Sequence, residues 1–488
     1  MTKTELTKKL TLFDVTNLVV GAIIGADIYV ASSFGAQLLG PFSLVVWVVA
    51  GVIAMVIALC FAMCAGLVPK VGGPYAYAKE AFGPFTGFVV GWSLWFAELI
   101  SLAVFPLAFT QYLTFFFPTL ANDVVLQAVV KIAFVAFLAA TNIVGVKAAG
   151  RVNDVLTIAK LAPLVFFVVA GIGWVTFNFG TASTSFAPPM APFGFGNFGT
   201  ALVLIFWAYA GFEISTIPAE EISNPEKTIP KAIVLGIIIV IVFYLTTNAV
   251  LFGVRNWHLL ATDAAPLANA GNAIFSSNAL LALVGGGIVG IGALISVAGS
   301  DESGMIGTSR LGFSLAADGL FPKIFARIHQ RFKTPSTSII IQSVMAVAAA
   351  VAAPFFGGLS LLIAVSVFFM AVAYLATCAS VFAFRRRHLT PAFHLRGGII
   401  IAALGIVFSL FLITQCTPIQ IGLGVALLLA GVPVYIKYSP KTEIAELKQT
   451  VLSRENILKR VYAQERTFLA HALLHLRQWY RRVTRKTS

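Results

Sequence analysis

VGAIIGADIYV, at residues 20–30, lies inside the first long apolar run of the chain, which covers roughly residues 11–38. Gly21 and Gly25 interrupt its helical pattern, and the carboxylate of Asp27 follows two residues after the second glycine. A charged group within a membrane-spanning segment costs roughly 2.5–3.5 kcal/mol on insertion scales. Broken backbone at membrane depth is tolerated only where protein covers it or where it lines a cavity. The stretch is therefore predicted to form the floor of a binding site.

The composition around this stretch is that of a membrane protein. The chain has 488 residues, of which 59% are hydrophobic and 11% are charged. Long apolar runs recur along most of its length, which indicates an all-α polytopic membrane protein. The polar start, MTKTELTKKLTLFDV, shows no cleavable signal pattern. Twelve spans are predicted, at residues 12–37, 42–68, 85–117, 122–146, 153–177, 197–220, 231–254, 279–311, 336–354, 358–384, 397–416 and 418–437.

Lysine and arginine in the short loops predict the orientation of these spans. With an even number of spans, both termini lie on one side, and most loop cations fall on that same side. The other side has little more than Lys131 and Arg255. We therefore expect a multi-pass protein of the inner, cytoplasmic membrane with both termini cytoplasmic. The cations on the predicted cytoplasmic side are Lys3, Lys8, Lys9, Lys70, Lys79, Lys147, Arg151, Lys227, Lys231, Arg310, Lys323, Arg327, Arg331, Lys333, Arg385, Arg386, Arg387 and Arg396.

The segment 439–488 differs from the rest of the chain and is predicted to be a separate cytoplasmic tail after a transporter-like membrane domain at 1–438. It holds eleven lysines or arginines against four glutamates, a net charge of +7 out of +14 for the whole chain. Apolar residues recur in it at helical spacing. A basic amphipathic helix suggests contact with anionic lipid, whereas packing on cytoplasmic loops or docking of a partner protein are the alternatives. The charge is not a nucleic-acid footprint, because it lies in loops and tail.

A short internal repeat links two of the predicted spans. Gly25-Ala26-Asp27-Ile28 in the first span and Gly211-Phe212-Glu213-Ile214 in the sixth both read glycine, any residue, carboxylate, isoleucine. Transporter folds often carry inverted repeats with discontinuous helices at matching positions. Five helices plus five inverted helices, with repeats at about 12–177 and 197–384 and two extra helices at 397–437, would account for all twelve spans.

These residues resemble the amino acid–polyamine–organocation permeases, which have the leucine-transporter-like fold. The resemblance covers roughly residues 10–435 and leaves out the tail. The glycine-rich break at 20–30 is similar to that family's Gly-Ser-Gly-Ile-Phe break. The other matching motifs are PKVGGPYAY at 69–77, GVK at 145–147 with Lys160, WAYAGFE at 207–213, EEISNPEKTIP at 220–230, SR at 309–310 and AADGLFP at 316–322.

The resemblance implies secondary active transport of amino acids, amines or related organic cations by alternating access. In that family the unwound parts of spans 1 and 6 hold the substrate through exposed backbone groups and half-helix dipoles. An aromatic residue six positions before the span 6 glutamate often covers it, and a span 5 lysine takes the sodium position in some proton-coupled members. The matching residues here are Gly25, Ala26, Asp27, Ile28 and Tyr29 in span 1, Trp207, Gly211 and Glu213 in span 6, and Lys160 for coupling.

Asp27 is where the chain departs from the family pattern, which has glycine at this position and serine where this chain has Ala26. An ionised Asp27 would repel the carboxylate of an amino acid and attract an ammonium group. It is therefore a candidate amine-binding anion or a protonatable coupling group. The alternative is an acid that pairs with Lys160 or caps broken backbone without contacting substrate.

Asp27 is one of five acids predicted to lie within the membrane. Isolated and facing lipid, they would together cost about 12–17 kcal/mol, so they must face the bundle interior, be protonated or be paired. An interior rich in negative charge favours a cationic substrate, proton carriage, or both. Asp301 and Glu302 point about 100° apart on a helix, so one is expected to face the cavity and the other a neighbouring helix. The resemblance favours Glu302 for the cavity, because the family often has a polar residue eight positions before Arg310, and Asp301 is the candidate for coupling. The other acids are Glu98 in span 3, a candidate for the site or for a structural hydrogen bond, and Glu213 in span 6.

Three functions remain open on this reading. The first is a proton-coupled permease or exchanger for amino acids or amines, with a tilt toward cationic substrates. The second is a neutral amino acid permease in which Asp27 is protonated or paired. The third is a transporter-like nutrient sensor that signals through its basic tail. The sequence shows no nucleophile–base pair or metal-ligand set, so we expect neither an enzyme nor a cofactor, and the expected partners are a small-molecule substrate, protons and membrane lipid.

Overall fold

The computed structural model of the chain describes residues 11–68, 72–144, 146–186, 196–213, 222–387 and 397–440, with side chains throughout except at 146–158. The described residues are almost entirely helical and contain no β-strand. The helices are α1 (Leu12–Ile23), α2 (Ala26–Leu39), α3 (Ser43–Ala65), α4 (Pro74–Phe82), α5 (Pro84–Phe116), α6 (Val124–Val144), α7 (Val146–Phe177), α8 (Phe179–Ser185), α9 (Phe198–Phe206), α10 (Pro225–Val254), α11 (Trp257–Leu260), α12 (Pro266–Ile274), α13 (Ala279–Ala317), α14 (Ser336–Phe356), α15 (Gly358–Arg386), α16 (Gly398–Gln415) and α17 (Pro418–Tyr438).

The helices confirm an all-α, multi-pass membrane architecture. Ten described segments are long and apolar enough to cross a membrane. One of these segments, Ala26–Ala65, holds both α2 and α3, so it contains the second half of the first predicted span and most of the second. The sixth predicted span begins as the shorter apolar helix Phe198–Tyr209. A helix therefore lies at each of the twelve positions predicted from the apolar runs.

The first predicted span breaks in the middle of VGAIIGADIYV. Helix α1 ends at Ile23, Ile24 is extended, and α2 begins at Ala26 after Gly25. A methyl group added at Gly25 would lie 2.4 Å from the side-chain oxygen of Ser300 on α13. Glycine is therefore favoured here, because the Ser300 side chain of α13 packs directly on this backbone.

The second break follows α9. The short 3-10 helix Trp207–Tyr209 continues α9, Ala210 is extended, and Gly211 adopts a φ of 116°, which favours glycine. A methyl group added at Gly211 would lie 2.6 Å from the carbonyl oxygen of Ala22 in α1. The two breaks therefore touch each other through backbone. Of the predicted repeat, Ile214 lies outside the described residues.

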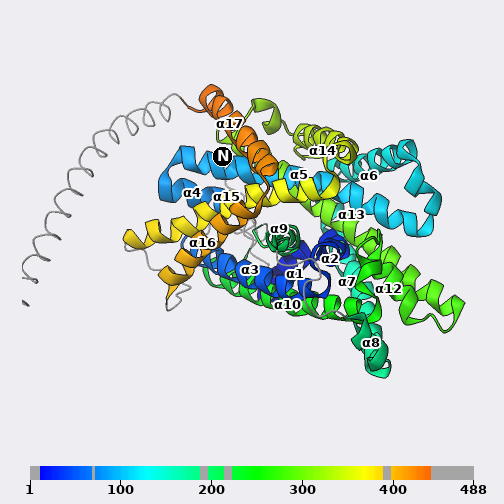
Figure 1. Cartoon of the computed structure of the whole chain (residues 1–488). Helices are drawn as coiled ribbons and strands as arrows, with labels where there is room; N and C mark the ends of the chain where they lie inside the picture. The colour runs from blue at the N-terminus through cyan, green and yellow to red at the C-terminus, as the bar shows by residue number, and fades with distance from the viewer. Residues whose placement is uncertain are drawn as a thin grey trace, which may run out of the picture. The chain divides into compact units, whose positions relative to one another are not determined.

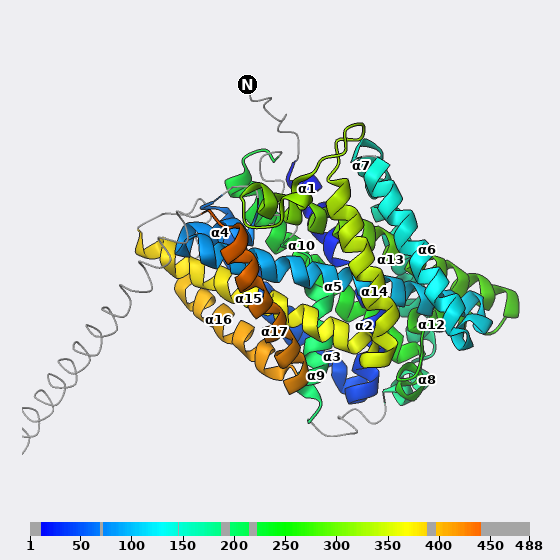
Figure 2. The same cartoon turned by 90° about the horizontal axis from the view of Figure 1, so that it is seen from above.

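The breaks lie among the other helices of the unit Met1–Tyr435. Figure 1 shows α1, α2 and α9 in its middle, with α3 and α10 beside them. Helix α10 packs against α3 and α1, and α5 packs against both α13 and α15. Figure 2 shows α5 crossing between α13 and α14 on one side and α15 and α16 on the other. Polar groups at the two breaks are thereby shielded from lipid.

Several sequence expectations concern parts of the chain that are described only in part. Residues 436–488 form a second compact unit, of which the structure describes 436–440, so the amphipathic tail lies outside the described residues. The predicted domain boundary at 438/439 and the inverted repeat stay predictions. The motif residues 69–71, 145 and 220–221 also lie outside the described residues. Cys60, Cys64, Cys378 and Cys416 are buried free cysteines.

Candidate functional site

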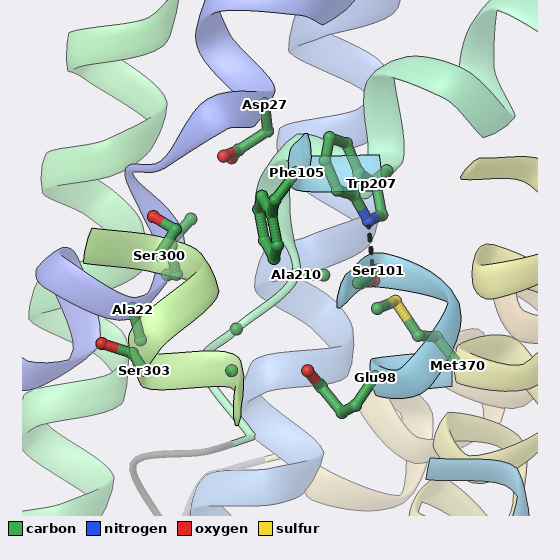
Figure 3. A pocket seen from close by; sticks show the side chains of 13 residues that line it. Ala22, Asp27, Glu98, Ser101, Phe105, Trp207, Ala210, Ser300, Ser303 and Met370 are labelled. Carbon is green, nitrogen blue, oxygen red and sulfur yellow. Dashed lines mark hydrogen bonds between the residues drawn. The ribbon is translucent and has the colours of Figure 1, made fainter. Parts of the chain in front are cut away.

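A cavity of about 50 Å³ lies where the two breaks meet. A cavity needs roughly 10–15 Å³ of such volume to hold a water molecule, so this one is large enough for water. Figure 3 shows Asp27 at one end of this group of residues and Glu98 at the other, with Phe105 and Ala210 between them. The lining residues are Ala22, Ile23, Asp27, Glu98, Ser101, Phe105, Trp207, Ala210, Gly211, Ser300, Ser303, Gly304 and Met370.

Asp27 lies in the first turn of α2 and is 6% exposed. Its Oδ2 accepts a hydrogen bond of 2.8 Å from the Tyr244 hydroxyl on α10. The same hydroxyl lies 3.0 Å from the carbonyl oxygen of Ile23, the last residue of α1. A tyrosine hydroxyl has one proton to donate, so Tyr244 shares it between the two halves of the broken helix. Sequence reasoning missed Tyr244, since no motif surrounds it in the apolar run of α10.

Lys160 lies on α7 and is 2% exposed. Its ammonium donates a hydrogen bond to the carbonyl oxygen of Gly21 in α1. The described residues hold no ion pair between Lys160 and Asp27, so the two groups contact opposite sides of the first break separately. Lys160 thus provides a hydrogen-bond donor for a backbone carbonyl near the break, and it does not line the cavity.

Glu213 follows the second break and is 3% exposed. Its Oε1 accepts a hydrogen bond of 2.9 Å from the Tyr374 hydroxyl on α15, and its Oε2 accepts one of 3.0 Å from the backbone N–H of Gly211. The Phe212 ring stacks on Tyr374, with 5.5 Å between the ring centroids. Glu213 therefore stabilises its own break and does not line the cavity. Tyr374, like Tyr244, was missed from the sequence.

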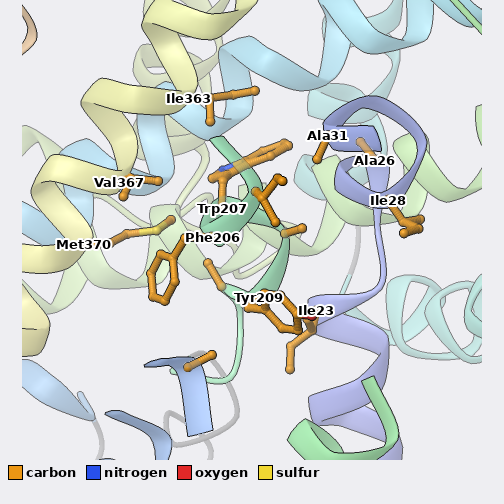
Figure 4. Close-up of a cluster of buried hydrophobic side chains, with 14 of the residues drawn as sticks. Ile23, Ala26, Ile28, Ala31, Phe206, Trp207, Tyr209, Ile363, Val367 and Met370 are labelled. Carbon is orange, nitrogen blue, oxygen red and sulfur yellow. The ribbon is translucent and has the colours of Figure 1, made fainter. Parts of the chain in front are cut away.

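Trp207 and Glu98 line the cavity from different helices. The Trp207 indole N–H donates a hydrogen bond of 3.2 Å to the Ser101 hydroxyl on α5, and Glu98 lies one turn before Ser101. Glu98 has no hydrogen-bond partner among the described residues. On its other faces Trp207 meets apolar side chains, with Ile363, Val367 and Met370 of α15 nearby in Figure 4. Trp207 thus forms a wall that one polar contact orients.

Helix α13 presents Ser300, Ser303 and Gly304 to the cavity. These positions are three and four residues apart and share one helix face. Asp301 and Glu302 lie between them and do not line the cavity, although both are buried. The helix phase therefore places serine hydroxyls where sequence reasoning expected the Glu302 carboxylate. The spacing of two serines beside the acid pair was the signal that could have identified this face.

The remaining sequence candidates form the support around the cavity. Tyr29 is fully buried against Tyr112, which donates a hydrogen bond of 2.8 Å to the Tyr29 carbonyl oxygen. Ala26 and Ile28 belong to the apolar core, and Gly25 packs on Ser300. Of the predicted site residues, the lining set thus includes Asp27, Glu98, Trp207 and Gly211.

The electrostatic character of the cavity comes from its two acids. Asp27 and Glu98 are its charged lining residues, and the described part of the chain contributes no lysine, arginine or histidine to the lining. Hydroxyls of Ser300 and Ser303 add neutral polar groups. Carboxylates bind ammonium groups through charge-assisted hydrogen bonds. The arrangement can therefore bind the ammonium group of a small molecule that carries an amine.

A comparison with protein families supports the same fold. The sequence profile described as "Amino acid permease" matches residues 10–436, which is nearly the whole described region. The match leaves out the tail and includes both breaks.

The chain is similar to several characterised proteins over most of their length. The branched-chain amino acid permease BcaP of Bacillus subtilis is 29% identical over 469 residues, covering 90% of this chain and 94% of that protein. The serine/threonine exchanger SteT of the same organism is 26% identical over 446 residues, covering 88% and 96%. The cystine/glutamate transporter of Pongo abelii is 30% identical over 354 residues, covering 70% and 67%.

Proposed function

This chain belongs to the amino acid permease family, and from that premise we propose that it moves amino acids or related amines across the cell membrane by alternating access. The relatives are transporters, so the protein is a multi-pass membrane transporter rather than an enzyme. The candidate substrate site is the cavity between the two breaks. Two observations support this assignment. The broken helices expose backbone groups at membrane depth, and acids face the cavity.

The tilt toward amines rests on one observation, the pair of carboxyls that line the cavity without a lining cation. Hydrogen bonds between an ammonium and a carboxylate are roughly twice as strong as neutral ones. In this proposal the substrate ammonium binds Asp27 or Glu98. Trp207 covers the bound molecule.

Substrate entry requires movement of the walls. The cavity measures about 50 Å³, whereas ligand sites for small organic molecules usually measure about 300–1,000 Å³. The breaks are the parts free to move, since their backbone is held by single contacts such as Tyr244 to Ile23 and Lys160 to Gly21. Alternating access would then consist of releasing these contacts on one side of the cavity at a time.

We propose that transport is coupled to protons through Lys160. A charged Lys160 donates to the Gly21 carbonyl and holds α1 in place, and loss of its proton weakens that bond. Accumulation of labelled substrate in proteoliposomes under a proton gradient should disappear in Lys160→Ala. A variant that still accumulates substrate under the gradient would exclude this role for Lys160.

A thermal-shift screen of the purified protein tests the substrate class. The panel holds amino acids with basic, acidic and neutral side chains, diamines and monoamines. Selective binding at a hundred times the dissociation constant stabilises the folded protein by about 2.7 kcal/mol. Basic amino acids or amines should give the largest shift. Shifts with neutral amino acids alone would refute the tilt toward amines while leaving transport in place.

A neutral amino acid permease is the second candidate, favoured by two of the relatives. The names of BcaP and SteT refer to branched-chain amino acids and to serine and threonine, which all have neutral side chains. In this reading Asp27 holds a proton and donates it to the Tyr244 hydroxyl, which in turn donates to Ile23. Binding of L-leucine but not of L-lysine by the wild type, with an affinity for L-leucine that is insensitive to Asp27→Asn, would support it.

The orientation is a further proposal, with both termini cytoplasmic because loop cations concentrate on that side. A cysteine introduced by Ser488→Cys should react with an impermeant thiol reagent only after cells are permeabilised. Asp123→Cys, in a loop on the opposite side, should react in intact cells. The reverse labelling pattern would invert the topology. Binding of the basic tail to anionic lipid belongs to the same proposal, and tail deletion should reduce binding of the solubilised protein to anionic vesicles.

A further inference from the structure

We propose that Asp301 is a proton-carrying site, separate from the substrate cavity and built into the neighbouring face of α13. Its side chain is 0% exposed, and neither carboxyl oxygen has a hydrogen-bond partner. Ser300, the preceding residue, lines the cavity, whereas Asp301 does not. The inference rests on the proposed function in one respect, since it supplies the proton site that coupled transport needs.

Cations lie on two of the helices packed against α13, but in the described residues none of them pairs with Asp301. Among the described residues, no ion pair or hydrogen bond involves this carboxyl. Its neighbour Glu302 carries the same charge, and α14 has no titratable residue. Arg310 lies on α13 itself, more than two helical turns from Asp301. Among the residues whose side chains are described, the titratable groups on the other packed elements are Asp14 on α1, Asp27 and Tyr29 on α2, Glu98 and Tyr112 on α5, Lys131 on α6, Lys160 on α7 and Lys323 in the 3-10 helix that follows α13.

Asp301 faces α14 rather than the breaks. It lies one helical turn before Met305, whose carbonyl oxygen accepts a hydrogen bond of 2.8 Å from Gln342 on α14. A carboxylate buried without a partner is strongly disfavoured, and such a group takes up a proton instead. Asp301 is therefore a neutral carboxylic acid in this conformation. Its position behind the cavity wall keeps that proton away from substrate.

Opening of the cavity provides a route for the proton to leave. Gly25 of the first break packs directly on Ser300, so movement of the break changes the contacts of α13 one residue from Asp301. When water reaches the carboxyl, its O–H bond breaks, the proton passes to water, and the electron pair stays on the carboxylate. Closure expels the water and requires a proton to return. The site thus takes up and releases one proton per cycle.

Infrared difference spectroscopy of the full-length protein in lipid tests the protonation directly and needs no substrate. At neutral pH the wild type should show a protonated carboxyl C=O band that Asp301→Asn removes. Asp123→Asn is the matched control, because it makes the same change at an exposed helix cap, and it should keep the band. An identical carboxyl band in wild type and Asp301→Asn would overturn the inference.

Proteoliposome transport then tests the coupling, with labelled L-lysine and labelled L-leucine as probes. Asp301→Asn should lose accumulation driven by a proton gradient and keep counterflow exchange of the same probe, while Asp123→Asn keeps both. Gradient-driven accumulation by Asp301→Asn at the wild-type level would also overturn the inference. If the wild type accumulates neither probe, the proposed proton coupling fails, and the infrared result alone decides whether Asp301 holds a proton.

Discussion

The two helix breaks share a sequence pattern but use their carboxylates differently. Each has a glycine in close contact with another helix and an acid two residues later. In each, a tyrosine hydroxyl on a helix distant in sequence donates a hydrogen bond to that acid. Asp27 lines the cavity, whereas Glu213 folds back onto the N–H of Gly211 and lies beside Phe212 and Tyr374. A shared motif therefore marks where a helix breaks, and the direction of the side chain decides what the acid does.

The glycines should show the largest difference between the breaks. Gly211→Ala places a methyl group 2.6 Å from the Ala22 carbonyl at a φ of 116°, so backbone must move. We expect a loss of about 2 kcal/mol or more in the free energy of unfolding, seen as a lower melting temperature in detergent. Gly25→Ala meets the Ser300 side chain instead, and combining it with Ser300→Ala should restore part of the loss. Equal rescue of Gly211→Ala by Ser300→Ala would contradict the distinction.

The acids should separate binding from support. Asp27→Asn removes a lining charge and should weaken binding of an amine by about 1.5–3 kcal/mol, roughly tenfold or more, with a much smaller effect on a neutral amino acid. Glu213→Gln should change affinity for the two ligands equally and mainly lower thermal stability. Isothermal titration with L-lysine and L-leucine measures both variants. Small, equal effects of Asp27→Asn on the two ligands would remove the support for a cation site.

The two tyrosines test the same difference between the breaks, with smaller expected effects. Tyr244→Phe removes one donor shared by Ile23 and Asp27, so it should cost about 1 kcal/mol and shift the pH dependence of amine binding. Tyr374→Phe should cost a similar amount of stability without changing that pH profile, since Glu213 does not line the cavity. Identical pH profiles for the two variants would mean that Asp27 does not titrate in the binding step.

The smallest expected effect concerns Trp207. Ser101→Ala removes the hydrogen bond of 3.2 Å that orients the indole, which should weaken ligand binding by about 0.5–1.5 kcal/mol. Thr110→Ala on the same helix is a suitable control, because Thr110 donates to its own helix at Pro106 and does not line the cavity. Ser101→Ala with affinity equal to the control would show that packing alone positions Trp207.

Most of the architecture could be predicted from the chain because its causes are local. Apolar runs predicted twelve spans, and a helix occupies each position. Glycines followed by acids predicted both breaks, because a glycine and a charged residue can be recognised within one span without knowledge of the helices that pack against it.

The identities of the lining residues were harder to predict, because they depend on helix phase and on partners far away in sequence. Ser300 and Ser303 face the cavity and Glu302 does not, a difference of one position along α13. Tyr244 lies 217 residues from Asp27, and Tyr374 lies 161 residues from Glu213. Neither tyrosine carries a local signature that would have identified it.

The amino-acid sequence by itself determined that this protein crosses the membrane many times, that its first and sixth spans break, and that acids follow each break. Hydrophobicity, glycine flexibility and the cost of buried charge act through residues close in the chain. Only the tertiary structure decided that the two breaks touch at Gly211 and Ala22, and that Asp27 rather than Glu213 lines the cavity. These outcomes depend on which helices pack side by side, since a buried polar group is satisfied by whatever donor the neighbouring helix presents.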